Sequence, residues 1–309
     1  QYLPNRGRVD YLHALAYSQC YCMAVEKLLD IKVPERAEYI RVITCELNRI
    51  TSHLLWFGAY LMDLGAFTPF LYCFDDREQI LDLLDGLTGS RLTYCFFRFG
   101  GAPLDIDDDF VAGCRAFVSR LRSRWDDYHN LVTKNVIFIH RTRDVGIITR
   151  EQCIKYGITG PNLRGSGIPY DIRKSEPYSA YPEFDFEIPI GSTGDIYDRY
   201  IVRLAEMEQS LRIIEQACNK LPGGPIMAEK VPKRIKPPVG EVYQAVETAR
   251  GEFGMYIVSQ GDVKPYRIKL RTPSFANMSI FPEMAQDNLV ADLVANLGSI
   301  DVVIPEIDR

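Results

Sequence analysis

Residues 34–65 read PERAEYIRVITCELNRITSHLLWFGAYLMDLG. Pro34 suits the first turn of a helix, because the N–H group that proline lacks has no partner there. The helix is predicted to run to about Gly65 and to be apolar on nearly every side, through Val42, Ile43, Leu47, Ile50, Leu54, Trp56, Phe57 and Leu61. A helix that is apolar all round lies inside its protein. This stretch therefore predicts a fold built around one long, buried helix.

The polar residues of this helix need partners if the helix is buried. Glu46, Arg49 and His53 follow one another at spacings of three and four, which places them on one face. They can satisfy one another and a neighbouring helix. A structural polar seam is the favoured interpretation, and a functional cluster is the alternative.

A second face of the same helix carries Leu55, Ala59 and Asp63 at successive spacings of four. A small apolar surface that ends in a carboxylate suits the head of an amphiphilic ligand. The alternative is that Asp63, near the helix end, caps the following turn.

The remaining chain predicts a mainly helical α+β fold. Only four of the eighteen prolines precede residue 150. Apolar periodicity predicts helices over about 10–30, 108–133, 195–220 and 284–297, and another over 74–86, where Asp75 and Asp76 favour the N-terminus. Residues 135–189 are rich in Gly, Pro and Asp and predict loops, short helices and a strand near 184–189. Strands over 241–247, 255–259 and 266–270 form an antiparallel meander.

Composition limits the classes of function. The 309 residues are 47% hydrophobic, which is typical of a globular chain, and a net charge of -5 gives no broad attraction to nucleic acid. The longest apolar run, residues 54–62, is too short to span a membrane. The eight cysteines are scattered, and Cys20 and Cys22 point to nearly opposite sides of a helix. We therefore expect reduced thiols, a cytosol-side location, and no Fe-S or other metal site in this chain alone.

Several familiar motifs are excluded. Gly165-Ser166-Gly167 is followed by Ile168-Pro169, which cannot open a dinucleotide-binding helix. The loop at 191–194 lacks the lysine of a phosphate-binding loop, and none of the four histidines lies in the context of a hydrolase nucleophile. Gln1 is not an initiator methionine, so we expect an N-terminal segment to be missing from this sequence.

The C-terminal residues 301–309, DVVIPEIDR, match a known pattern from which the metal ligands have been lost. The large subunit of nickel-iron hydrogenases ends in Asp-Pro-Cys-x-x-Cys-x-x-His/Arg, and Val303 and Glu306 stand at the cysteine positions. With this tail the chain resembles the quinone-site subunit of respiratory complex I, the family of the NADH-quinone oxidoreductase D subunit. Further matching segments are RVDY (8–11), GPNLRGSG (160–167), YDIRK (170–174), GDIYDRY (194–200), RGEFG (250–254) and PYR (265–267).

The resemblance implies a hydrogenase large-subunit-like fold in a single domain over 1–309. Its helical core would comprise about 10–133 and 195–220. A small α/β and antiparallel-strand side region would comprise about 135–190 and 225–275, and a C-terminal helix and tail would comprise 284–309.

The resemblance also implies a function. The chain would be a peripheral-arm subunit of a proton-translocating NADH-quinone oxidoreductase that forms a quinone-reduction chamber with an Fe-S partner subunit. Quinone would be the substrate, and the chain alone would bind no cofactor. Tyr11 would donate a hydrogen bond and a proton to the quinone carbonyl, and Asp63 would pair with a histidine on an N-terminal hairpin loop. The chamber wall would also contain Arg8, Leu55, Ala59 and Val303, with charges from Asp301 and Arg309.

Other subunits of the complex, including membrane-arm subunits, are the implied partners, with no nucleic acid. The implied location is the cytoplasmic face of the bacterial inner membrane, peripherally attached, and the alternative is the matrix side of the mitochondrial inner membrane. A rival function is a non-catalytic scaffold subunit of a related membrane-bound hydrogenase-like complex. A nickel-binding hydrogenase would need two Cys-x-x-Cys pairs, and the C-terminal pair is absent from this sequence.

Overall fold

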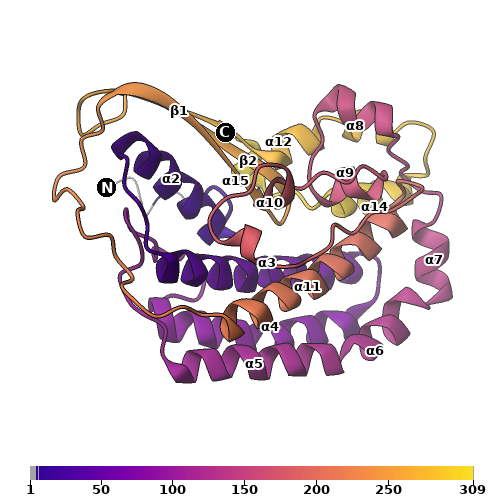
Figure 1. Cartoon of the computed structure of the whole chain (residues 1–309). Helices are drawn as coiled ribbons and strands as arrows, with labels where there is room; N and C mark the ends of the chain where they lie inside the picture. Colours follow the sequence, from indigo (N-terminus) through magenta and orange to yellow (C-terminus); the bar gives the residue numbers. More distant parts are fainter. Residues whose placement is uncertain (1–4, 6, 309) are drawn as a thin grey trace.

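A computed structural model of the chain describes Asn5 and residues 7–308, and it confirms a mainly helical α+β fold. The long helix α3 (Glu35–Asp63) runs through the middle of the molecule (Figure 1). Helix α2 (Ala14–Leu29) and a small sheet lie on one side of it, and α4 (Phe67–Thr88) and α5 (Asp108–Ser123) lie on the other. Helix α11 (Ile196–Asn219) crosses it. The predicted long helix is confirmed within two residues at its C-terminus.

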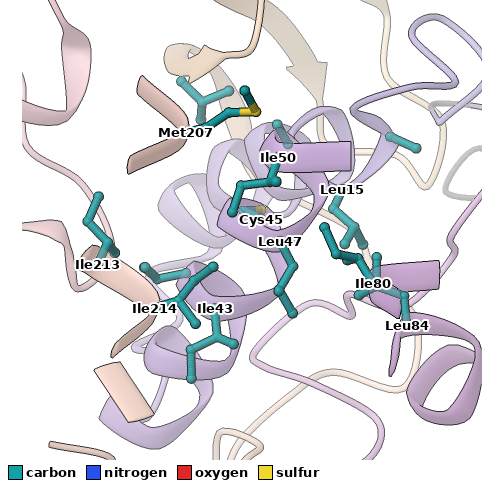
Figure 2. Close-up of a cluster of buried hydrophobic side chains, with 14 of the residues drawn as sticks. Leu15, Ile43, Cys45, Leu47, Ile50, Ile80, Leu84, Met207, Ile213 and Ile214 are labelled. Atoms are coloured by element: carbon teal, nitrogen blue, oxygen red, sulfur yellow. The ribbon is translucent and has the colours of Figure 1, made fainter. Parts of the chain in front are cut away.

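The apolar core is organised around α3. Figure 2 shows side chains of α3 between those of three other helices, α2, α4 and α11. The buried residues labelled there are Leu15 from α2, Ile43, Cys45, Leu47 and Ile50 from α3, Ile80 and Leu84 from α4, and Met207, Ile213 and Ile214 from α11. Burying one such side chain contributes roughly 1.5–3 kcal/mol. Four helices are thereby held together, and α3 is inaccessible over most of its length.

The polar residues of α3 lie together in a buried seam that faces α11. Nε of Arg49 lies 3.1 Å from Oε2 of Glu46, which also accepts a hydrogen bond of 2.6 Å from Ser210 on α11. Nε2 of His53 lies 3.2 Å from Oε2 of Glu206 on the same helix. Glu46 and Arg49 therefore bond to each other and Glu46 to a neighbouring helix, whereas neither ring nitrogen of His53 has a hydrogen-bond partner among the residues that the structure describes. That the seam is structural and not functional stays a prediction.

Arg164 extends this seam to the side region. It lies in the short helix α9 (Pro161–Gly165) and donates from Nε to Glu206 (2.7 Å) and from Nη1 to Glu247 (2.8 Å). Burial by itself raises the pKa of Glu206, but the charge of Arg164 and the nearby ring of His53 outweigh it and lower the pKa to about 2. Glu206 is therefore an ionised carboxylate in the protein interior.

The start of α4 differs from the prediction. The helix begins at Phe67, so Asp75 and Asp76 lie within it and do not favour its N-terminus. Nη1 of Arg124, just after α5, lies 2.7 Å from Asp75 and 2.6 Å from Asp76. These carboxylates thus join two helices.

The predicted helix over 108–133 is realised as three consecutive pieces: α5, α6 (Trp125–Tyr128) and a π-helical turn (His129–Thr133).

Residues 135–190 contain short helices, as predicted: α7 (Val136–Thr142), α8 (Arg150–Tyr156), α9, α10 (Ile172–Ser175) and a 3-10 turn (Tyr181–Glu183). The predicted strand near 184–189 is wrong. In this segment the backbone N–H of Asp185 donates to the side chain of Gln216 (3.0 Å), and that of Glu187 donates to the side chain of Gln209 (2.9 Å). Both glutamines lie on α11. Side chains of a helix therefore take the place of a neighbouring strand.

The predicted antiparallel meander is confirmed as β1 (Val239–Thr248), β2 (Gly251–Gln260) and β3 (Arg267–Arg271), in the order β1-β2-β3. Ala249 and Arg250 form the two-residue turn between β1 and β2. Helix α2 packs on the sheet, where the rings of Tyr17 and Phe253 have centroids 4.0 Å apart. The sheet thereby places the β1–β2 turn beside the start of α2.

The last part of the chain comprises α12 (Pro273–Met278), α13 (Phe281–Met284), α14 (Val290–Ile300) and α15 (Ile304–Ile307). The predicted helix over 284–297 was placed too early, because Asp287 adopts a left-handed conformation (φ 59°) that interrupts a helix there. Within the described residues, every helix is too short or too polar to cross a membrane.

Candidate functional site

The segment before α2 is shaped by Asp10. Its Oδ1 accepts hydrogen bonds from the backbone N–H groups of Leu12 (3.0 Å) and His13 (3.2 Å). These bonds hold a turn, so α2 begins at Ala14 and the predicted start at Asp10 is wrong. The other oxygen, Oδ2, lies 2.8 Å from Nη1 of Arg250. Asp10 is fully buried. One of its oxygens therefore holds the turn, and the other forms an ion pair with a residue far away in the sequence.

Arg250 links three distant parts of the chain. In addition to Asp10, its Nη1 donates to Oγ of Ser52 on α3 (3.2 Å), and its Nη2 lies 3.4 Å from Oδ1 of Asp301. Burial raises the pKa of Asp10, and the charge of Arg250 opposes that rise. The β1–β2 turn therefore joins the start of the chain to its C-terminal segment.

The C-terminal segment lies inside the molecule. Asp301 ends α14 in a left-handed conformation, and the side chains of Asp301 and Val303 are both buried. The backbone N–H of Val303 donates to Oγ of Ser274 on α12 (3.3 Å). Arg309, the other predicted tail charge, lies outside the described residues.

Glu306 is buried among hydroxyl groups. Its Oε1 accepts a hydrogen bond from the hydroxyl of Tyr17 on α2, and its Oε2 contacts Oγ of Ser274. Its backbone carbonyl accepts from Oγ1 of Thr272 (2.8 Å). Burial, followed by the negative charge of Asp10, raises the pKa of Glu306 to about 8. The carboxyl group is thus largely neutral at pH 7.

Tyr11 and Arg8 lie on the surface of the same turn. The side chain of Tyr11 is 38% exposed, although both of its sequence neighbours, Asp10 and Leu12, are buried. Arg8 is exposed. The phenol of Tyr11 is therefore accessible to a ligand beside the Asp10–Arg250–Asp301 bridge.

The predicted face of α3 starts beneath this bridge. All residues of α3 from Ala37 to Leu54, except Glu38, are buried, whereas Leu55 and Ala59 are partly exposed and Asp63 is exposed. Ser52, which contacts Arg250, lies on the same face because it precedes Leu55 by three residues. At about 1.5 Å per residue, this face extends roughly 16 Å from Ser52 to Asp63.

A cleft of about 230 Å³ lies at the C-terminal end of α3, lined mostly by apolar residues including Leu61, Leu64, Val132 and Phe138. Leu61 is two residues from both Ala59 and Asp63, so the cleft lies on a different side of the helix from the predicted face. The structure thus brings Tyr11, Asp301 and Val303 to neighbouring segments at one end of the α3 face and leaves Asp63 at the other end.

Sequence reasoning missed Arg250, Ser52, Tyr17 and Ser274 as site residues. RGEFG (250–254) was used only as a matching segment, although a charged residue in a two-residue turn between apolar strands is itself a signal. Ser52, Tyr17 and Ser274 give no such signal, because small or aromatic polar residues are common on helices.

The chain was compared with known proteins. The family described as "Respiratory-chain NADH dehydrogenase, 49 Kd subunit" matches residues 63–237 and 229–309. The D subunit of NADH-quinone oxidoreductase from Syntrophobacter fumaroxidans is 62% identical over all of this chain and 83% of the relative. Its counterpart from Desulfotalea psychrophila is 61% identical over the same shares, and the D 2 subunit from Opitutus terrae is 55% identical over all of this chain and 77% of the relative.

These similarities place the chain among the subunits of respiratory NADH dehydrogenases, which act as oxidoreductases within complex I. It belongs to the family of the 49 kDa subunit, which is called the D subunit in the bacterial relatives. Its partners are accordingly the other subunits of complex I.

Proposed function

We propose that this chain forms one wall of the quinone-reduction chamber of complex I, at the turn that carries Tyr11 and along the exposed face of α3. The observation that carries the proposal is the ionic bridge from Asp10 through Arg250 to Asp301. It joins the Tyr11 turn, the head of the α3 face and the C-terminal segment into one region.

The chemistry of quinone reduction fits the residues of this region. Adding two electrons to a quinone requires two protons, so the wall must supply a donor near a carbonyl oxygen. Tyr11 is an exposed phenol, whose hydroxyl can donate a hydrogen bond. Arg8, on the same turn, supplies a permanent positive charge for the negative charge that develops on the quinone.

The α3 face suits the rest of an amphiphilic quinone. Leu55 and Ala59 offer a partly exposed apolar surface that ends at Asp63. In this proposal Asp63 orients a histidine of the N-terminal hairpin loop that the family resemblance implies. In this proposal Val303 lines the chamber from the C-terminal segment and Asp301 supplies a charge beside it.

The opposite wall and the electron-donating Fe-S cluster belong to a partner subunit in this proposal. The chain would be attached peripherally through the complex, including its membrane-arm subunits, on the cytoplasmic face of the bacterial inner membrane. The alternative location is the matrix side of the mitochondrial inner membrane.

The proposal is tested with Tyr11→Phe in the intact complex. General acid groups typically contribute roughly 10²–10⁴-fold to a rate, and water can replace part of this, so we expect kcat for a short-chain quinone to fall at least about tenfold. The control is Tyr266→Phe, because Tyr266 is an exposed tyrosine in the loop before β3. Reduction of a water-soluble acceptor by NADH, which bypasses the quinone, should be unchanged in both variants. A parental quinone rate in Tyr11→Phe would remove the proposed role.

A scaffold subunit that only docks the Fe-S partner is the alternative. Photo-crosslinking with a quinone-site inhibitor separates the two functions. The quinone-chamber proposal expects labelled peptides that contain Tyr11 or Val303, whereas a scaffold would be labelled no more strongly there than at Tyr266.

A further inference from the structure

Three buried carboxyl groups gather where α2 meets the C-terminal segment. Asp10 and Asp301 both lie beside Arg250, at 2.8 and 3.4 Å, and Glu306 lies near Asp10. Arg203 on α11 adds a second positive charge near Asp301. If all three carboxyl groups were ionised, this carboxyl cluster would carry one more negative charge than positive charge. An uncompensated charge in the protein interior is costly, so the cluster favours binding a proton.

Glu306 is the member whose direct partners are neutral. Among the described residues, its carboxyl oxygens contact the hydroxyl groups of Tyr17 and Ser274, whereas Asp10 and Asp301 have Arg250. Tyr17 donates to Oε1 and Ser274 donates to Oε2, and neither hydroxyl brings a positive charge to the carboxyl group.

Three buried polar atoms of the cluster have no hydrogen-bond partner among the residues that the structure describes: Oδ2 of Asp301, Nε of Arg250 and Nε of Arg203. Unpartnered donors and acceptors both occur, so the hydrogen-bond count does not decide where a proton lies. The complete burial of Glu306 and its neutral direct partners are what favour a proton on its carboxyl group.

The contacts of Glu306 determine where the C-terminal segment lies. Tyr17 belongs to α2, and Ser274 also accepts the backbone N–H of Val303. We propose that Glu306 is a positioning residue that works in its protonated form, holding the C-terminal segment on α2 and thereby keeping Val303 and Asp301 in place beside Tyr11. This inference rests on the proposed quinone function of that region.

Loss of the proton has a defined physical consequence. An ionised Glu306 places a further negative charge near Asp10. The charged groups that face it are Asp10 and Arg250, and Tyr17, Ser274 and Thr272 are its neutral neighbours. Repulsion between the carboxylates would displace α15 from α2. Quinone reduction should therefore decline at alkaline pH, in step with the ionisation of Glu306.

The test uses Glu306→Gln in the intact complex, because glutamine has the shape and the neutrality of a protonated glutamate. The matched control is Glu283→Gln, since Glu283 also accepts a hydrogen bond from a tyrosine, Tyr156, but has a side chain that is 33% exposed. Rates of short-chain quinone reduction are measured from pH 6 to pH 10 and divided by the rate with a water-soluble acceptor that bypasses the quinone. Infrared difference spectra between the two ends of this range report the buried carboxylic acid directly.

The parent complex and Glu283→Gln should lose activity above about pH 8 and should show the infrared signal of a carboxylic acid that ionises. Glu306→Gln should lose the infrared signal and retain activity at least one pH unit further into the alkaline range. An unchanged alkaline decline or an unchanged infrared signal in Glu306→Gln would overturn the inference.

A second variant covers failure of the first to assemble. Tyr17→Phe removes the donor to Oε1 while preserving the ring contact with Phe253, and it should move the alkaline decline by at least half a pH unit. An unmoved decline in Tyr17→Phe would likewise overturn the inference. If Tyr11→Phe kept the parental rate, the quinone proposal would fail at Tyr11, whereas the infrared signal would still report whether Glu306 holds a proton.

Discussion

Replacing Glu206 by glutamine tests whether the buried seam between α3 and α11 is structural. The pKa of Glu206 is held at about 2, against 4.5 for an unperturbed glutamate. Each pKa unit corresponds to about 1.4 kcal/mol, so the ionised carboxylate contributes about 3 kcal/mol at neutral pH. Glu206→Gln also leaves Arg164 without one of its closest carboxylates, and breaking a buried ion pair typically costs about 3–5 kcal/mol. We therefore expect a loss of at least about 3 kcal/mol.

The assay heats the intact complex and quantifies the soluble fraction of this chain by mass spectrometry of its peptides. A loss of 3 kcal/mol lowers the unfolding midpoint of a chain of this size by roughly 6 °C. Glu215→Gln is the control on the same helix, because Glu215 pairs with Arg122 at the surface and such pairs contribute at most about 1 kcal/mol. The KM for quinone should stay at the parental value in both variants.

The pH dependence adds a second criterion. Because the pKa of Glu206 is lowered on folding, its contribution is present above about pH 4.5 and is lost as the pH falls towards 2. The difference between parent and Glu206→Gln should shrink to about half near pH 3. An unchanged midpoint at pH 7, or a raised KM with unchanged stability, would refute the structural interpretation and favour a functional cluster.

Two further substitutions test the packing around α3, with the same heating assay. Gly298→Ala places a Cβ atom 2.6 Å from Cδ2 of Tyr60 and should destabilise the chain by about 1–3 kcal/mol, whereas Gly86→Ala, with no atom within 4 Å of the new Cβ, should stabilise α4 by about 0.5–1 kcal/mol. Equal midpoints for these two variants would contradict the described packing of α14 on α3. Asp76→Asn breaks a buried pair with Arg124 and should cost about 3 kcal/mol. Asp82→Asn, in a surface pair with Arg91, should cost less than about 1 kcal/mol, and a similar loss in both variants would argue against the buried pair.

Elements with regular apolar periodicity were predictable from the sequence. Helices α3 and α11 and the three-stranded meander lie where the pattern placed them, because each buries a continuous apolar face. The errors lie where a side chain satisfies the backbone. Asp10 holds a turn that delays α2, and Gln209 and Gln216 bond a segment that was predicted to be a strand. The glutamines are distant in sequence from the segment that they bond, and Asp10 bonds backbone N–H groups that would otherwise belong to the first turn of a helix. The periodicity of apolar residues reveals neither kind of bond.

The candidate site was predictable only in part, for a related reason. The spacing of Leu55, Ala59 and Asp63 was sufficient to place them on one face, and the structure leaves that face accessible. Tyr11 and Val303 were assigned through the family resemblance alone. Arg250 contacts Asp10, next to Tyr11, and Asp301, two residues before Val303, and a single sequence contains no signal for such long-range contacts.

The C-terminal segment has protein contacts at the two positions where the resembling hydrogenase pattern has metal ligands. Where the resembling hydrogenase pattern has cysteines, this chain has Val303 and Glu306, and both are buried. Ser274 contacts both of them, through the backbone N–H of Val303 and the carboxyl group of Glu306, while Tyr17 ties Glu306 to α2. The position of the segment therefore depends on hydrogen bonds that are sensitive to a proton. In the proposed function, this segment would respond to pH beside the chamber where quinone reduction would consume protons, because a carboxyl group stands at the position that the resembling pattern gives to a cysteine.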